Sequence, residues 1–206
     1  MKTNIEELDK IIDGLNAGEL ITIAGRPAVG KSSFVISIIN NLSKQISKKI
    51  LYFNLDSSKE NIIDCTNVEI INDVSNIEDI ENMINEKYKQ GISLVVIDYL
   101  QLITTLNGYP IETEEKFYTS RVLKTLALNL NIPIIVVSQL GISIEKREDK
   151  RAVLSDIKPF GLQLDSDKII CLYRNKCSSK MLNYIELDII KNHYGPLGSV
   201  IVKLNK

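Results

Sequence analysis

Five short apolar runs, rich in β-branched residues, alternate with stretches of helical pattern along most of the chain. The runs are Leu20–Ala24, Ile50–Leu55, Leu94–Asp98, Pro133–Ser138 and Lys168–Tyr173. This alternation predicts an α/β fold, a mostly parallel sheet flanked by helices and joined by right-handed crossovers. Because the runs are apolar at successive positions, we expect helices to cover both faces of the sheet.

The end of the chain has a different pattern. Tyr184–Lys191 and Ser199–Leu204 flank the Gly/Pro cluster Gly195–Gly198, which predicts a C-terminal antiparallel β-hairpin. The polar stretch Asn107–Glu115 and the charged stretch Glu145–Arg151 are predicted to be loops. The sequence contains no internal repeat and no long linker, so we expect a single domain over residues 1–206.

Composition limits the classes of protein to which the chain can belong. Its 25 Lys and Arg against 26 Asp and Glu give a net charge of -1, so any contact with DNA must be local. Cys65, Cys171 and Cys177 form no C-x-x-C pair, which predicts reduced thiols rather than disulfides or a zinc site. No apolar stretch approaches ~18 residues and the N-terminus has no apolar leader, which predicts a cytoplasmic protein with no membrane contact.

The segment Gly25–Ser32 matches the pattern G-x-x-x-x-G-K-[ST] in full. It lies between the predicted strand Leu20–Ala24 and the predicted helix Ser33–Ser47, which is the context that this phosphate-binding loop requires. Backbone N–H groups and the helix N-terminus would surround the phosphates, Lys31 would reach the β- and γ-phosphates, and Ser32 would offer an oxygen to Mg²⁺. The pattern therefore predicts a nucleotide bound through its phosphates together with Mg²⁺. The alternative is a structural turn that binds no ligand.

A carboxylate for the metal is offered by the apolar run that ends in Asp98. Asp98 fits the role of the acid that holds Mg²⁺ together with Ser32. The alternative is that Asp98 only ends the strand.

Several segments together resemble one family, the RecA-like motor domain of DnaB-type replicative helicases. They occur in the family's order and are Thr3–Gly30, Val95–Ile103, Ser120–Lys124, Ile132–Leu140, Asp149–Asp156 and Tyr173–Arg174. The resemblance implies one RecA-like P-loop ATPase domain with a catalytic set consisting of Lys31, Asp56, Asp98 and Gln139. It also implies that the nucleotide is ATP, held by a nucleotide-binding set of Gly25, Arg26, Pro27, Ala28, Val29, Gly30, Lys31, Ser32 and Ser33.

Besides Asp98, two further residues of the implied catalytic set have an alternative interpretation. Gln139 would sense the γ-phosphate and couple it to the DNA-binding loops, or it is only the polar end of a strand. Asp56 stands where the family has a Glu and would orient or deprotonate the attacking water. It is one methylene shorter, which could slow turnover. Alternatively, the segment Asp56–Glu60 is a helix N-cap.

The family supplies two charges to the neighbouring subunit's ATP from a K-x-R segment before a Gly-Pro turn. Here Lys191 keeps the first charge, and His193 stands in the position of the arginine finger. A neutral imidazole cannot replace a guanidinium, although His193 would be partly charged at mildly acidic pH. The alternative is that His193 is a solvated surface residue.

The resemblance also implies partners. Single-stranded DNA would contact Lys146, Arg147, Lys150 and Arg151, although the acids between them cancel much of the charge, and a solvated loop is the alternative. The family forms a homo-oligomer, a hexamer, with replication partner proteins. The resemblance to the motor domain begins at Thr3, so we expect no N-terminal domain and no docking linker helix as in the family, and we expect such a ring to lack one of its surfaces. The segment between Asp56 and Leu94 is also shorter than in the family.

Two functions remain open. The favoured one, implied by the family segments together with Lys31, Asp98 and Gln139, is an ATP-dependent DNA helicase-like motor that couples ATP hydrolysis to translocation on single-stranded DNA. The other, favoured by Asp56, His193 and the missing N-terminal region, is a degenerate DnaB/RecA-like ATPase with slow or no hydrolysis. Such a protein would act as a nucleotide-binding regulatory or interaction protein.

Overall fold

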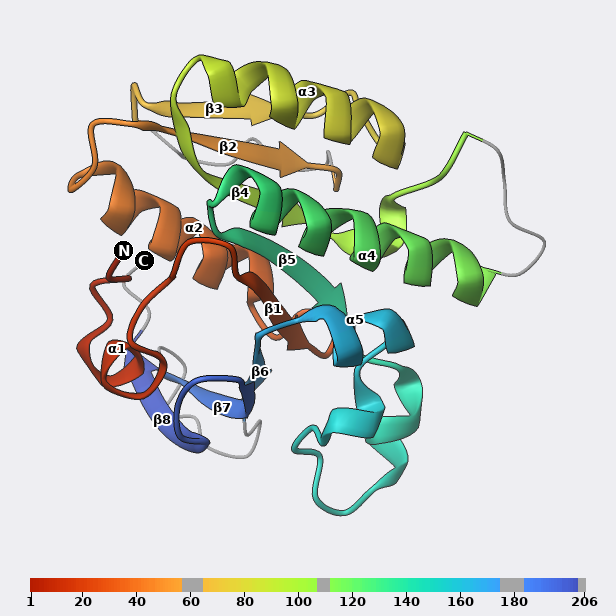
Figure 1. Ribbon diagram of the computed structural model, residues 1–206. Coiled ribbons are helices and arrows are strands. Elements are labelled where there is room, and N and C mark those ends of the chain that lie inside the picture. The colour runs from red at the N-terminus through yellow and green to blue at the C-terminus, as the bar shows by residue number, and fades with distance from the viewer. Residues whose placement is uncertain (57–64, 107–111, 175–183, 204–206) are drawn as a thin grey trace.

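The computed structural model describes residues 1–56, 65–106, 112–174 and 184–203 (Figure 1). The strands are β1 (Leu20–Gly25), β2 (Lys49–Asn54), β3 (Val68–Ile71), β4 (Ile92–Asp98), β5 (Ile134–Gln139), β6 (Lys168–Tyr173), β7 (Tyr184–Asn192) and β8 (Gly198–Lys203). The α-helices are α1 (Glu6–Ile12), α2 (Lys31–Ser43), α3 (Ile77–Lys89), α4 (Glu112–Leu130) and α5 (Phe160–Asp165). Short 3-10 turns are η1 (Leu100–Leu102), η2 (Ile142–Lys146) and η3 (Leu154–Asp156).

All eight strands belong to one sheet, in the order β3-β2-β4-β5-β1-β6-β7-β8. The pairs from β3 to β6 are parallel, and β7 and β8 add an antiparallel hairpin at one edge. The predicted mostly parallel sheet with a C-terminal hairpin is therefore confirmed. The described part of the chain contains no helix long and apolar enough to span a bilayer.

Local predictions differ from the structure in several places. The predicted helix Ser33–Ser47 corresponds to α2, which begins at Lys31 and ends at Ser43, and the predicted loop Glu145–Arg151 begins inside η2. Strand β3 was not predicted, because it has only four half-buried residues and exists through its pairing with β2 at the sheet edge. The predicted loop Asn107–Glu115 is wrong over its last four residues, which form the first turn of α4. Acidic residues such as Glu114 and Glu115 are favoured in the first turn of a helix, so their polarity does not indicate a loop. Residues 107–111 lie outside the described part.

Each face of the sheet packs against its own set of helices (Figure 1). On one face, Leu20 and Ala24 of β1 belong to the apolar core formed with α3 and α4. On the other face, Ile21 and Ile23 belong to the core formed with α1 and α2. This two-sided burial explains why the strands are apolar at successive positions.

Because strands β1 to β6 run in parallel, their carboxyl ends lie together on one side of the molecule and their amino ends on the opposite side. We call these two sides edges, and they differ from the edge strands of the sheet. The carboxyl ends of β1, β2, β4 and β5 lie at the edge where α2 begins. The hairpin turn lies at the opposite edge, because Asn192 at the end of β7 pairs with Lys168 at the start of β6.

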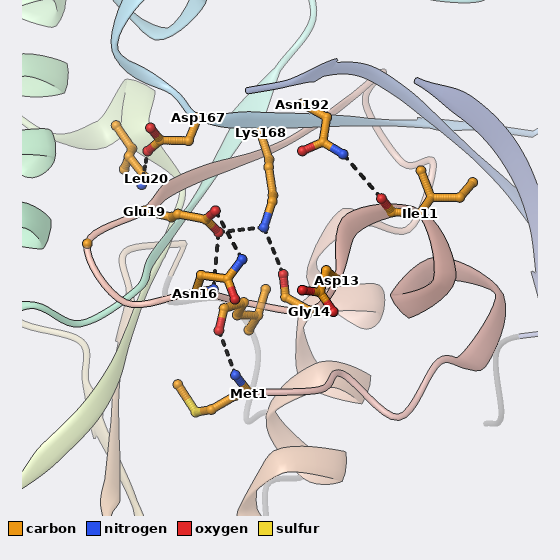
Figure 2. Close-up of polar contacts among 12 residues, drawn as sticks. Met1, Ile11, Asp13, Gly14, Asn16, Glu19, Leu20, Asp167, Lys168 and Asn192 are labelled. Carbon is orange, nitrogen blue, oxygen red and sulfur yellow. Dashed lines mark hydrogen bonds and ion pairs between the residues drawn. The ribbon is translucent and has the colours of Figure 1, made fainter. Parts of the chain in front are cut away.

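A buried polar network ties the chain together at this second edge (Figure 2). The side chain of Lys168 is 1% exposed, and its Nζ donates to Glu19 Oε2 at 2.6 Å and to the Gly14 carbonyl at 2.9 Å. Glu19 also accepts from the backbone and side-chain nitrogens of Asn16. Nearby, Asp167 accepts from the Leu20 N–H at 2.8 Å. These bonds fix the turn that leads into β1.

Candidate nucleotide site

The loop between β1 and α2 is shaped by two glycines. Gly30 has φ of 108°, a left-handed conformation that favours glycine, and α2 begins at the next residue. A Cβ on Gly25 would lie 2.7 Å from Val29 Cγ1, so only glycine allows the loop to fold back this closely. The N-terminus of α2 therefore faces the space above the carboxyl ends of the strands.

Lys31 and Ser32, at the start of α2, face the carboxyl end of β4. Lys31 Nζ donates to the Arg26 carbonyl at 3.1 Å, across its own loop. The hydroxyl of Ser32 hydrogen-bonds the carboxylate of Asp98, and Tyr52 Oη donates to Asp98 Oδ2 at 3.4 Å. The lysine, the hydroxyl and the carboxylate of the predicted site are therefore brought together.

Asp98 is only 2% exposed, and this burial raises the pKa of its carboxyl above the ordinary value. The hydrogen bond from Ser32 and the charge of Lys31 act in the opposite direction, and the charge of Asp56 adds to the rise. Burial and the Asp98 carboxylate likewise raise the pKa of the Tyr52 hydroxyl, so Tyr52 remains a donor at any physiological pH. The site concentrates negative charge that a cation would neutralise.

A cavity of about 360 Å³ joins these groups. Its lining comprises Pro27, Ala28, Gly30, Lys31, Ser32, Ser33, Asp56, Asp98, Tyr99 and Gln139. All four members of the predicted catalytic set thus line one cavity. Three predicted nucleotide-binding residues, Gly25, Arg26 and Val29, do not line it, and the side chain of Arg26 turns away from it toward Glu145.

Strand pairing explains why Asp56 and Asp98 meet. Asn54 pairs with Asp98 in the β2–β4 ladder, and the Leu55 N–H donates to the Asp98 carbonyl at 2.8 Å. Asp56 follows directly and enters the cavity. The helix that Asp56 would cap falls in residues 57–64, which lie outside the described part, so that alternative stays a prediction.

Gln101 is a residue whose role the sequence did not indicate. Its Nε2 donates to Ser138 Oγ at 3.0 Å and to the Gln139 carbonyl at 3.1 Å, and its Oε1 accepts from the Gln139 N–H at 3.3 Å. Ser138 Oγ in turn donates to the Lys158 carbonyl at 2.6 Å. The backbone of Gln139 is thereby held where the β4–β5 pairing has already ended. In the sequence, the only sign of this role is that Gln101 has a polar amide between the apolar residues Leu100 and Leu102. Its hydrogen-bond partners, Ser138 and Gln139, are 37 and 38 residues away, so the sequence does not identify them.

The donor set fits Mg²⁺ bound together with a nucleotide. Ser32 and Asp98 offer hard oxygen ligands, and Mg²⁺ commonly takes one or two protein ligands with the rest from phosphates and water. Within residues 1–56, 65–106, 112–174 and 184–203, no group of three or more His, Cys, Asp or Glu could hold a metal by itself. The cavity therefore suits a metal that arrives with its phosphates.

Three of the four basic residues predicted to contact DNA form ion pairs within the chain. Lys150 Nζ lies 3.1 Å from Glu145, and Arg147 Nη2 lies 2.6 Å from Asp156. Arg151 forms a two-pronged pair with Glu186 of β7, with its closest approach at 2.8 Å. The exposed Lys146 has no ion pair with any residue of the described ranges. The positive charge of this segment is thus largely neutralised by nearby acids, of which Glu186 belongs to the sheet.

Lys191 and His193 lie beside the amino end of β6, whereas the cavity lies at the carboxyl ends of the parallel strands. Lys191 Nζ donates to the carbonyls of Gln163 and Leu164 at the end of α5, and its burial lowers the pKa of the ammonium. The exposed ring of His193 lies 4.7 Å from the ring of Tyr194. Neither residue can reach the nucleotide cavity of its own chain.

The remaining predicted features concern the cysteines. Cys65 and Cys171 are free thiols, and Cys171 is buried in the sheet, which raises its pKa. Cys177 lies outside the described residues.

Comparisons with known proteins give one consistent result. The family model described as "DnaB-like helicase C terminal domain" matches residues 1–71 and 66–206. The replicative DNA helicase DnaB of Geobacillus stearothermophilus is 32% identical over 96% of this chain and 53% of its own length. The replicative DNA helicase DnaC of Bacillus subtilis is 30% identical over 96% of this chain and 53% of its own length.

Solved structures agree with the sequence relatives. One of them, described as an ATPase domain, superposes with a TM-score of 0.87 at 26% identity, covering 98% of this chain and 86% of that one. A DnaB-like replicative helicase, solved in a study of its interactions with primase, superposes with a TM-score of 0.88 at 25% identity. It is covered over 60% of its length, against 98% of this chain.

The lengths also differ in a consistent way. The chain spans about half the length of the curated relatives that it matches. The alignment with the Geobacillus protein runs over 242 positions, more than the 206 residues of the chain, so the relative carries segments that this chain lacks.

Proposed function

Because the chain belongs to the family of DnaB-like helicase C-terminal domains, we propose that it is an ATP-hydrolysing motor that couples hydrolysis to movement along single-stranded DNA. The observation that carries the proposal is the cavity that joins the phosphate-binding loop to Asp56, Asp98 and Gln139. These side chains come from the ends of three different strands and from the start of α2. A structural turn would not need them to converge.

The phosphate-binding loop would hold the nucleotide. The N–H groups at the start of α2 donate to phosphate oxygens, and the helix dipole favours their negative charge. Lys31 Nζ exchanges the Arg26 carbonyl for the β- and γ-phosphates. Ser32 and Asp98 would hold Mg²⁺, which would supply positive charge to neutralise the phosphates.

Asp56 and Gln139 would act on the side of the cavity where the γ-phosphate ends. The carboxylate of Asp56 orients the attacking water and can accept its proton. The amide of Gln139 contacts the γ-phosphate, and Gln101 holds its backbone so that the amide stays in place. When the γ-phosphate is lost, Gln139 loses this contact, and its movement is transmitted along the segment after β5, which contains Lys146–Arg151.

Lys191 and His193 would serve a second copy of the chain. Because they lie at the edge opposite the cavity, a head-to-tail ring brings the hairpin of one copy to the cavity of the next. We propose a homo-oligomer of this kind, a hexamer as the family resemblance implies. Single-stranded DNA and replication proteins are its proposed partners.

The test is steady-state ATP hydrolysis at neutral pH with and without single-stranded DNA, with Lys31→Ala as the blank. The motor predicts turnover that exceeds the blank and rises several-fold with DNA. Turnover equal to that of the blank under both conditions, with nucleotide still bound, would contradict the motor and leave a nucleotide-binding protein without hydrolysis.

A further inference from the structure

The side chain of Arg26 connects the phosphate-binding loop to a distant part of the chain. Its guanidinium is nearly buried, and Nη1 lies 2.9 Å from Glu145 Oε1. Its Nη2 donates to the Arg174 carbonyl at 3.1 Å, just beyond β6. The backbone carbonyl of the same residue accepts from Lys31 Nζ. Any displacement of Arg26 therefore changes the surroundings of the phosphate-contacting lysine.

Glu145 is shared between two cations. Oε1 binds Arg26, and Oε2 binds Lys150 at 3.1 Å. Hydrogen bonds from Lys150 and Arg26 hold the pKa of the Glu145 carboxyl below its usual value, so it is anionic at neutral pH. One carboxylate thus lies between the nucleotide loop and the basic segment Lys146–Arg151.

A second link runs through Tyr173. The guanidinium carbon of Arg26 lies 5.6 Å from the ring centroid, and that of Arg151 lies 4.7 Å from the same ring. Arg151 is also paired with Glu186 of β7. Lys150 and Arg151, at the end of the basic segment, therefore each share a partner with Arg26.

We propose that Arg26 is a positioning residue that couples occupancy of the basic segment Lys146–Arg151 by a nucleic-acid backbone to the phosphate-binding loop, through the shared carboxylate of Glu145. The inference rests on the proposed function and adds a route between its two sites. The cavity lining excludes Arg26, so its side chain acts through the loop that it anchors.

The physical basis is competition between two cations for one carboxylate. Without DNA, Lys150 and Arg26 divide the charge of Glu145. When a backbone phosphate binds Lys150, Glu145 pairs with Arg26 alone and holds it more tightly. Arg26 then fixes the loop in the form that binds the nucleotide. Nucleotide binding must by the same linkage raise the affinity for DNA.

The experiment measures the dissociation constant of a non-hydrolysable ATP analogue with and without saturating oligo(dT), at one ionic strength, for wild type, Glu145→Gln and Glu148→Gln. Glu148 is an exposed acid of the same segment, so its variant makes the same charge change without touching Arg26. We expect DNA to tighten nucleotide binding at least about fivefold in wild type and Glu148→Gln, and less than about twofold in Glu145→Gln.

Affinity for DNA separates coupling from simple electrostatics. Removing either acid should leave DNA binding equal or tighter, because both variants lose a negative charge beside the phosphates. Coupling predicts that Glu145→Gln binds DNA at least as tightly as wild type, while DNA no longer tightens the binding of the ATP analogue. Lys150→Gln provides an independent check, because it should tighten analogue binding without DNA.

Several results would overturn the proposal. One is that DNA tightens analogue binding in Glu145→Gln as much as in wild type, and another is that this tightening is lost equally in Glu148→Gln. The proposal also fails if Lys150→Gln has unchanged analogue affinity, or if DNA has no effect on analogue binding in a wild type that still hydrolyses ATP. A wild type that binds no nucleotide would instead overturn the proposed function, and this inference with it.

Discussion

The buried pair of Lys168 and Glu19 allows a quantitative test of what holds the second sheet edge together. In Lys168→Met an unbranched apolar chain of similar length replaces the lysine, and Glu19 keeps only its bonds from Asn16. The two side chains are 1% and 5% exposed, so the remaining carboxylate is left in the interior without its cation. Removing one partner of such a pair costs about 3–5 kcal/mol. For a chain of this size that corresponds to a fall in Tm of roughly 6–20 °C.

Thermal unfolding followed by circular dichroism, without nucleotide, is the assay. Lys10→Met is the matched control, because Lys10 pairs with Glu6 at 2.7 Å but both side chains are more than two-thirds exposed. Solvent screens that pair, so the control should have the Tm of the wild type.

A double-mutant cycle tests the cause of the loss. Lys168→Met with Glu19→Gln removes both buried charges, and the double variant should be more stable than Lys168→Met alone. The reasoning is refuted if Lys168→Met unfolds like the Lys10→Met control. It is equally refuted if the losses of the two single variants simply add.

Three further predictions concern the nucleotide site and its surroundings. Gln101→Glu removes the amide donors that hold Gln139, so kcat for ATP should fall between about 10- and 100-fold with KM nearly unchanged, as steady-state kinetics would show; a rise in KM at constant kcat would contradict the positioning role. Burial raises the pKa of Asp98, so above the ordinary value of 3.8 this carboxyl binds more protons in the folded than in the unfolded state, and its contribution to the stability of the wild type falls as pH rises through that window. Asp98→Asn lacks this contribution, so the unfolding free energy of the variant minus that of the wild type should rise with pH and then level off, and a difference that stays constant in denaturant titrations would argue against it. Because Cys171 is buried and its pKa is raised, iodoacetamide should modify Cys65 before Cys171 in the native protein, which peptide mass mapping would show and an equal rate at both thiols would disprove.

Much of the fold could be predicted from local pattern. The strand Lys168–Tyr173 agrees with its prediction to the residue, and the other four apolar runs are strands within two residues of their expected bounds. Period and β-branching are properties of short windows, and short length with β-branched residues distinguishes a buried strand from a buried helix segment. The edge strand β3 was missed because its stability depends on a partner distant in sequence.

The candidate site likewise has one part that the sequence predicts and one part that depends on the tertiary structure. The loop from Gly25 to Ser32 is recognisable because its backbone angles and close contacts require glycine at stated positions. That Asp56 and Gln139 lie in the same cavity depends on the strand order β2-β4-β5-β1, which brings ends from distant parts of the chain to one edge.

The sequence by itself determined the α/β class, the phosphate-binding loop and the acid at the end of β4, because each depends on residues close together in the chain. Only the tertiary structure decided which charges are available. It pairs Arg151 with Glu186 of β7, and it turns Arg26 toward Glu145 and away from the cavity that its own loop forms. It also places Lys191 at the far edge, bound to α5. A charged side chain takes the partner that folding brings near it, and that choice is made between segments that no local pattern connects.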